Sequence, residues 1–266
     1  MEQIDKRIEP GLSRVPEVTL DFWLIKLLAV TMGETAADYL AVNLGFGLTT
    51  TSALMAGLLC IALAVQFSMR RYVPWAYWIA VVLISVVGTL VTDNLTDNFG
   101  IPLETSTILF TVLLCTTFAV WYALERTLSI HTIYSFRREA MYWLAILFTF
   151  ALGTAAGDLV AEQFEFGYLT TGLIFGGVIG VIAFAYFVLN LNAILAFWLA
   201  YIFTRPLGAS FGDLLSQPVE YGGLGFGTTY TSLMFLAAII ALVAFMTLRQ
   251  REAHITPIMP KTAGLK

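Results

Sequence analysis

Charged residues are scarce in this sequence. Only 12% of its 266 residues are Asp, Glu, Lys or Arg, whereas 59% are hydrophobic. Soluble globular domains carry roughly 25% charged residues, so the composition argues against an ordinary soluble domain. It predicts an integral membrane protein whose first partner is the lipid bilayer.

Cysteine and histidine are almost absent, with two of each. Cys60 and Cys115 lie within apolar runs, and neither His131 nor His254 has a second Cys or His at ligand spacing. These positions argue against a disulfide framework and against a thiolate or imidazole metal site. The sequence also lacks a nucleotide-binding loop, a His-Glu metal motif and a nucleophile at recognisable spacing from a base. We therefore expect no enzyme, no cofactor and no direct use of ATP.

Long apolar stretches are abundant, and each is about as long as a helix that crosses roughly 30 Å of hydrocarbon. Runs such as Leu54 to Val65 are apolar on every side, whereas transmembrane β-strands alternate. The first stretch is too long for a cleavable signal, so we expect it to remain as an anchor. The sequence thus predicts an all-α membrane protein of eight spans, near 21–42, 49–68, 76–96, 104–124, 141–163, 168–188, 193–215 and 228–247.

Basic residues in the connecting segments are confined to one side of the predicted membrane. They precede the first span and follow the second, fourth and eighth: Lys6, Arg7, Arg14, Arg70, Arg71, Arg126, Arg137, Arg138, Arg249, Arg251, Lys261 and Lys266. By the positive-inside rule, both termini are expected in the cytoplasm. The outer loops carry acids that would concentrate cations: Asp97, Glu104, Glu165 and Glu220. With 18 acidic against 14 basic residues, no nucleic-acid partner is expected.

A tryptophan, a glycine and an aspartate recur four times at fixed spacing, with Gly ten residues after Trp and Asp five residues after Gly. The four sets are Trp23, Gly33 and Asp38; Trp78, Gly88 and Asp93; Trp143, Gly153 and Asp158; and Trp198, Gly208 and Asp213. Since each repeat holds two spans, all four cross the membrane in the same direction. The pattern predicts four parallel two-helix repeats with pseudo-fourfold or nested pseudo-twofold symmetry.

In these features the chain resembles the bacterial membrane-protein family of four tandem copies of a "repeat of unknown function", each with two transmembrane regions and a tryptophan. The resemblance extends from Phe22 to about Met246. It implies this architecture and a bacterial cytoplasmic membrane, and it supplies no substrate. The segments we expect are a cytoplasmic N-terminal segment 1–20, repeats at 21–72 and 73–127, a linker 128–140, repeats at 141–190 and 191–248, and a cytoplasmic tail 249–266.

The four aspartates are the main candidates for function. The helix rise puts each about 22 Å from its tryptophan, still within hydrocarbon, where an ionised carboxylate costs at least a few kcal/mol. Each has a polar residue four positions away, which predicts a shared helix face. The predicted ion-binding residues are therefore Glu34 with Asp38, Asp93 with Asp97, Asp158 with Glu162, and Asp213 with Gln217.

Four parallel repeats would bring these faces together as a ring of oxygen atoms. Hard divalent cations such as Mn²⁺, Mg²⁺ or Ca²⁺ prefer such ligands. The candidate metal ligands are Glu34, Asp38, Asp93, Asp158 and Asp213. Without a cation, crowded carboxylates repel one another and some should bind protons. In the alternative interpretation, the aspartates bond to hydroxyl groups that open the second helix of a repeat, and only fasten helices.

Two basic residues stand inside the predicted spans. Arg205 occupies the position held by Val30, Ser85 and Phe150 in the other repeats, which predicts a buried guanidinium paired with a carboxylate. The adjacent Pro206 predicts a kink. Lys26 lies near the start of its span and is expected to extend to the cytoplasmic interface. The four tryptophans are expected to anchor helices at that interface, and the four glycines to allow close helix packing.

These features favour a transporter for a small inorganic cation, with divalent metals such as manganese first, intramembrane carboxylates as the site and proton coupling as a companion hypothesis. One alternative is a membrane scaffold, sensor or assembly factor. Another is a proton-coupled exporter of small organic molecules, which would need a wide cavity lined by Trp, Phe and Tyr. The sequence leaves the oligomeric state open.

Overall fold

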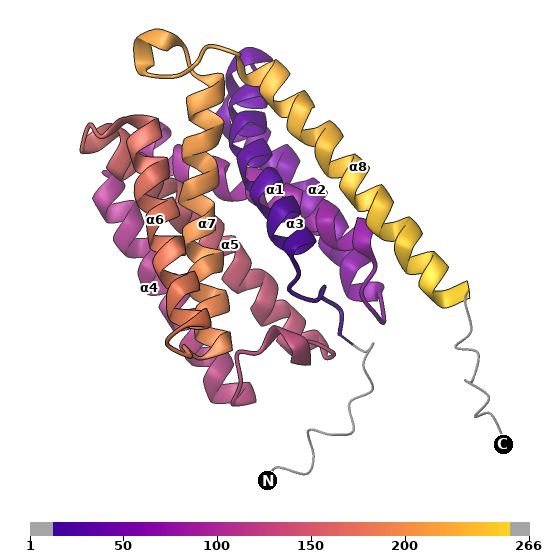
Figure 1. Ribbon diagram of the computed structural model, residues 1–266. Coiled ribbons are helices and arrows are strands. Elements are labelled where there is room, and N and C mark those ends of the chain that lie inside the picture. Colours follow the sequence, from indigo (N-terminus) through magenta and orange to yellow (C-terminus); the bar gives the residue numbers. More distant parts are fainter. Residues whose placement is uncertain (1–12, 256–266) are drawn as a thin grey trace, which may run out of the picture.

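The computed structural model describes residues 13–255, with side chains through Arg249. Within these residues the chain forms eight α-helices and no strand (Figure 1). The helices are α1 (Leu20–Asp38), α2 (Leu48–Ser68), α3 (Pro74–Asp93), α4 (Leu103–Glu125), α5 (Phe136–Asp158), α6 (Gly167–Phe187), α7 (Ala193–Ser216) and α8 (Thr228–Ile255). The predicted basic residues Lys6, Arg7, Lys261 and Lys266 lie outside the described residues, as do the side chains of Arg251 and His254.

Seven of these helices, α2 to α8, are long and apolar enough to cross a membrane, so the chain is a multi-pass membrane protein. The helix α1, which corresponds to the predicted span 21–42, is not among them. Its 19 residues include four charged side chains, Asp21, Lys26, Glu34 and Asp38. These charges lower the hydropathy of α1.

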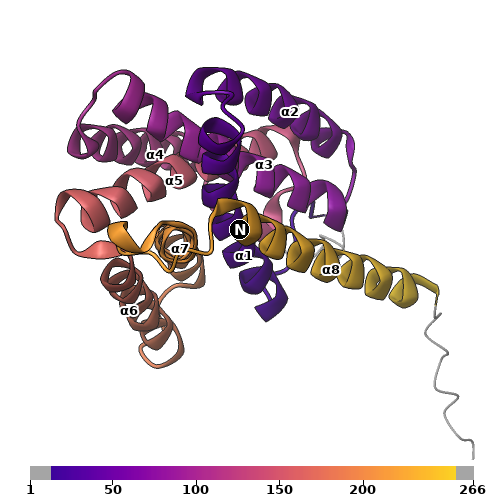
Figure 2. The same cartoon turned by 90° about the horizontal axis from the view of Figure 1, so that it is seen from above.

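Four inner helices form a closed ring of contacts, in which α1 packs on α3, α3 on α5, α5 on α7, and α7 on α1. The other four helices lie outside this ring (Figure 2). Each packs mainly on the inner helix of the following repeat: α2 on α3, α4 on α5, α6 on α7, and α8 on α1. Neighbouring repeats are therefore interlocked, and the last repeat closes onto the first.

The repeated glycines are the points where inner helices meet most closely. A Cβ atom added to Gly33 would clash with Ser85, one on Gly88 with Phe150, one on Gly153 with Arg205, and one on Gly208 with Val30. Each clashing residue lies three positions before the glycine of the next repeat, so the same contact occurs four times around the ring. The prediction that these glycines allow close helix packing is confirmed.

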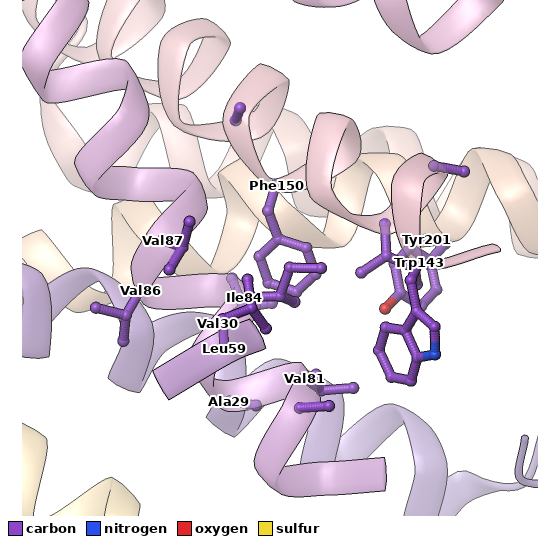
Figure 3. Close-up of a cluster of buried hydrophobic side chains, with 14 of the residues drawn as sticks. Ala29, Val30, Leu59, Val81, Ile84, Val86, Val87, Trp143, Phe150 and Tyr201 are labelled. Carbon is purple, nitrogen blue, oxygen red and sulfur yellow. The ribbon is translucent and has the colours of Figure 1, made fainter. Parts of the chain in front are cut away.

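The apolar core lies between the inner helices, where Phe150 points toward Ile84 and Val30 (Figure 3). At the end of the bundle where α1 begins and α8 ends, which we call the terminal end, Trp78, Trp143 and Trp198 are buried, and Trp23 is partly buried. The prediction that the four tryptophans anchor helices at the membrane interface is therefore wrong for these three. Their rings pack on aromatic neighbours instead; Trp198, for example, contacts Phe118 and Trp121 from α4.

The segment that precedes α1 crosses the terminal end of the bundle. Arg14 forms an ion pair of 2.7 Å with the buried Glu139 at the start of α5. The buried Gln66, at the end of α2, donates a hydrogen bond of 2.9 Å to the same carboxylate. These contacts tie the segment to helices from two different repeats. Glu139 is fully buried, and these two contacts provide partners for both of its carboxylate oxygens.

Gly88→Ala should destabilise the fold. The added Cβ would lie 2.7 Å from Phe150 Cβ and 3.2 Å from the Ala151 backbone nitrogen, so α3 and α5 would have to separate. Such overpacking typically costs about 1–3 kcal/mol. The matched control is Gly177→Ala in α6, where the added methyl group meets nothing within 4 Å. Thermal unfolding of the purified proteins should show a lower Tm for Gly88→Ala alone; an unchanged Tm would contradict the close contact.

Candidate functional site

The side chains that face inward on the four inner helices recur in steps of four residues, starting from the residue that precedes the tryptophan of each repeat. Residues four apart share one side of a helix, so each step forms a layer across the ring. The layer that precedes the tryptophans comprises Phe22, Tyr77, Tyr142 and Phe197. The next comprise Lys26, Val81, Ile146 and Tyr201; then Val30, Ser85, Phe150 and Arg205; then Glu34, Thr89, Thr154 and Ala209; and finally Asp38, Asp93, Asp158 and Asp213.

All side chains in the first four layers are buried. We call the last layer, Asp38, Asp93, Asp158 and Asp213, the acidic layer. Asp213 is buried and the other three are partly buried. The site therefore runs along the axis between the inner helices, from an aromatic end near the chain termini to an acidic end at the opposite side of the bundle.

Arg205 and Glu34 form an ion pair inside the ring. The Nη1 atom of Arg205 lies 2.8 Å from Glu34 Oε2, and both side chains are buried. The Nη2 atom of Arg205 donates hydrogen bonds to the hydroxyl oxygens of Thr89 and Thr154, and Thr89 donates to Glu34 Oε2 at 3.2 Å. The charge pair is thus held by side chains from all four inner helices. The prediction that Arg205 is buried and paired with a carboxylate is confirmed.

Lys26 is also fully buried, and the prediction that it extends to the interface is wrong. Its Nζ atom donates a hydrogen bond of 2.8 Å to the Tyr201 backbone carbonyl and lies 4.0 Å from the centroid of the Tyr201 ring. Among the described residues it forms no ion pair. The Phe150 ring is close to both basic groups, with Lys26 Nζ at 6.0 Å and Arg205 Cζ at 5.4 Å. Aromatic faces stabilise these desolvated cations.

The aromatic layer lies at the terminal side of Lys26. The hydroxyl groups of Tyr77 and Tyr142 form a hydrogen bond with each other, and Phe22 packs on Phe197. Trp198, which packs on Tyr142 and Phe197 of this layer, donates a hydrogen bond of 2.9 Å to the Leu128 carbonyl in the segment between α4 and α5. No residue of the layer is more than 9% exposed, so it closes the axis toward the terminal end.

The structure keeps the predicted pair of Glu34 and Asp38 on one face of α1 and turns the predicted partners of Asp93 and Asp158 away. Glu34 belongs to the layer that precedes the acidic layer along α1. Gln217, which was predicted to pair with Asp213, donates a hydrogen bond of 3.3 Å to Asp38 across the α7–α1 junction. Asp97 and Glu162 are exposed. A π-helical turn follows α3 at Asn94–Asn98 and α5 at Leu159–Gln163, and this wider turn changes the direction of the residues within it. Glu162 instead accepts a hydrogen bond from Tyr168.

Among the side chains of residues 13–249, no three from His, Cys, Asp or Glu come close enough together to hold a metal ion. The five candidate metal ligands, Glu34, Asp38, Asp93, Asp158 and Asp213, therefore do not form a ready-made metal cluster. Nor do the described hydrogen bonds join these aspartates to the hydroxyls that open the outer helices. Three of those hydroxyls bond elsewhere, since Ser52 and Thr49 accept from Asn94 and Asn98, and Thr228 donates to Asn43.

Sequence reasoning missed Thr89 and Thr154, which hold Arg205, and the hydrogen-bonded Tyr77 and Tyr142. A signal for both sets was present. Thr89 and Thr154 stand eleven residues after their tryptophans, as Glu34 does, and the tyrosines directly precede theirs. Extending the repeat alignment in steps of four residues would have placed them on the same helix face as the aspartates.

Comparison with protein families gives one match. A family model described as a repeat of unknown function matches four segments of the chain, at residues 22–72, 76–127, 141–191 and 196–252. The searches of curated proteins and of solved structures each found no match.

Removing one member of the central ion pair should cost more than removing both. Arg205→Met leaves Glu34 buried without its cation, which typically costs about 3–5 kcal/mol. The added substitution Glu34→Gln should recover at least ~1 kcal/mol of that loss, because contacting residues are not additive. As a control, Arg137→Met removes a 3.9 Å pair with Glu125 on an exposed side chain and should cost under ~1 kcal/mol. Unfolding of the purified variants measures these differences; strictly additive values would show that the two charges do not interact.

Proposed function

We propose a function from the structure of the axial site. The chain belongs to the family defined by this repeat of unknown function, and the description of that family carries no activity. The protein is a transporter of a small inorganic cation, with divalent metal ions such as Mn²⁺ first, and transport is coupled to protons. The acidic layer is the outer binding region. The Arg205–Glu34 pair is the central element that responds to the bound ion.

The observation that carries this proposal is the charge balance of the axis. The axial layers hold five carboxyl groups, those of Glu34 and the acidic layer, against two basic groups, those of Lys26 and Arg205. Ionised carboxylates away from bulk water are costly unless they are neutralised. Three carboxyl groups therefore require positive charge from another source, and a divalent cation or protons can supply it. Competition between the two for the same oxygens is the basis of coupling.

Glu34 connects the two parts of this mechanism. It lies one helical turn from Asp38 on α1, and its Oε2 atom contacts Arg205. A cation or proton that reaches Glu34 from the acidic layer would compete with the guanidinium. Arg205 would then rely on its remaining contacts with Thr89 and Thr154, and the junctions of α7 with α1 and α5 would change. The ion pair thus has two states, formed and broken, and a ligand bound at Glu34 would favour the broken state.

The same proposal includes the arrangement in the membrane. The closed ring of contacts and the fourfold recurrence of the glycine contact support four parallel repeats around one axis, with α1 as the eighth span. A span of mixed polarity is tolerated where it is enclosed by other helices, and α1 contacts α3, α7 and α8. The basic connections support a cytoplasmic location for both termini in a bacterial cytoplasmic membrane. Labelling of a cysteine placed at Leu224 by an impermeant reagent from outside the cell tests this orientation.

The two alternatives are less well supported. An exporter of organic molecules would need an aromatic cavity on the axis, whereas the axial aromatic layer is closely packed. A cavity of about 580 Å³ lies instead between α3 and α8, and none of its lining residues is charged. A scaffold would use the aspartates to fasten helices, but among the described residues only Asp38 has a side-chain partner, Gln217.

The test is ion transport by purified protein in liposomes. Asp38→Asn with Asp158→Asn preserves side-chain shape and removes two carboxylates, so Mn²⁺ transport should fall by about tenfold or more, a loss of at least ~1.4 kcal/mol in ion binding. Asp21→Asn, in the first turn of α1 and outside the acidic layer, is the matched control and should retain activity.

Transport by the wild-type protein and not by the double variant supports the acidic layer as the site, provided that the variant keeps its fold. Equal transport by both proteins would remove the acidic layer from the mechanism. A wild-type protein that moves neither divalent cations nor protons would contradict the transporter and favour the scaffold.

A further inference from the structure

A groove between α3 and α8 lies outside the axial site. The first half of α8 packs on α1, and the helix then runs obliquely past α3 and projects beyond the other helices (Figures 1 and 2). The facing surfaces of α3 and α8 leave a groove of about 580 Å³ between them. This volume falls within the range of roughly 300–1,000 Å³ that is usual for ligand sites.

Each wall of the groove is one apolar side of a helix. On α3 it includes Trp75, Ile79 and Val82, and on α8 it includes Ile240, Val243 and Thr247, with steps of three and four residues on both helices. The α8 wall runs from Leu236 to Leu248, which corresponds to about 18 Å along the helix. That length is close to one leaflet, since half of the hydrocarbon core is about 15 Å.

Basic residues are sequence neighbours of the groove-lining residues Trp75 and Leu248. Arg70 and Arg71 come shortly before Trp75, and Arg249 directly follows Leu248. All three arginines are exposed, and within the described part of the chain none of them forms an ion pair. Trp75 is 45% exposed, and an amphipathic ring suits the boundary between headgroups and acyl chains. The apolar groove, about one leaflet deep, thus ends beside three arginines that form no ion pair with the described residues.

We propose that this groove binds an anionic phospholipid from the leaflet on the side of the chain termini. One acyl chain lies between α3 and α8, and the phosphate headgroup meets Arg70, Arg71 and Arg249. The exposed arginines favour an anionic lipid over a transmembrane helix of a partner, because the apolar surface of such a helix offers them no negative charge. The proposal does not depend on the transport function, since no axial residue contributes a charge to the groove.

The experiment measures lipid binding to the purified full-length protein by native mass spectrometry, with phosphatidylglycerol and phosphatidylcholine of the same chain length. The wild-type protein should bind phosphatidylglycerol more tightly. Arg70→Gln with Arg71→Gln should weaken that binding about thirtyfold, which corresponds to about fivefold for each arginine near a headgroup, and leave phosphatidylcholine binding nearly unchanged. Arg126→Gln with Arg137→Gln is the matched control, because it removes two exposed arginines from another connection on the same side.

A second pair of variants tests the apolar groove itself. Ala244→Phe fills the groove, whereas Ala241→Phe places the same ring on the exposed part of α8 that does not line it. Phosphatidylglycerol binding should be lost in the first variant and retained in the second. Equal affinity of the wild-type protein for both lipids, or equal binding by the two phenylalanine variants, would overturn the proposal. So would a lipid-free dimer that Ala244→Phe abolishes, because the groove would then be an interface between two copies of the chain.

Discussion

The close contact of the inner helices at four glycines is the constraint on which the rest of the structure depends. At each junction a larger residue from the next repeat, Ser85, Phe150, Arg205 or Val30, occupies the space that a glycine side chain leaves free. The backbones can then approach, and the side chains one turn away on either side are brought toward a common axis. Without these contacts, the ion pair between Arg205 and Glu34 could not be shared among four helices. The outer helices secure the ring, because each packs on the next repeat.

The first and fourth repeats break the pattern where charge is concentrated. The first contributes Lys26 and Glu34, the fourth contributes Arg205, and the second and third supply the threonine hydroxyls that bind it. The aspartates, by contrast, are the same in every repeat. A common acidic layer with an asymmetric centre fits a protein that receives cations at one end and converts their binding into movement at one junction. The junction of α7 with α1 is the place where both members of the charge pair meet.

The helices themselves could be predicted from the sequence. The predicted spans 104–124 and 193–215 differ by at most one residue from α4 and α7, because bilayer thickness fixes the length of an apolar run. The role of the glycines and the pairing of Arg205 also followed from the repeat. The position of Lys26 did not, since the helix rise places it near an interface but only the packing of Tyr201 and Phe150 encloses it.

Other features depend on contacts between distant parts of the chain. The packing of each outer helix on the following repeat is not visible in a repeat pattern, because every repeat looks self-contained. The exposure of Asp97 and Glu162 depends on π-helical turns, which have no clear sequence signature here. Thr89 and Thr154 were identifiable in principle, since they occupy the position of Glu34 in the other repeats.

The central claim is that the axial carboxyl groups exchange protons for a cation. Adding Mn²⁺ to the purified protein in a weakly buffered solution with a pH indicator tests it directly. The account predicts saturable ion binding with the release of at least one proton per ion, because among the described residues only Glu34, of the five axial carboxyl groups, has a basic partner. Ion binding without proton release, or no binding at all, would contradict it.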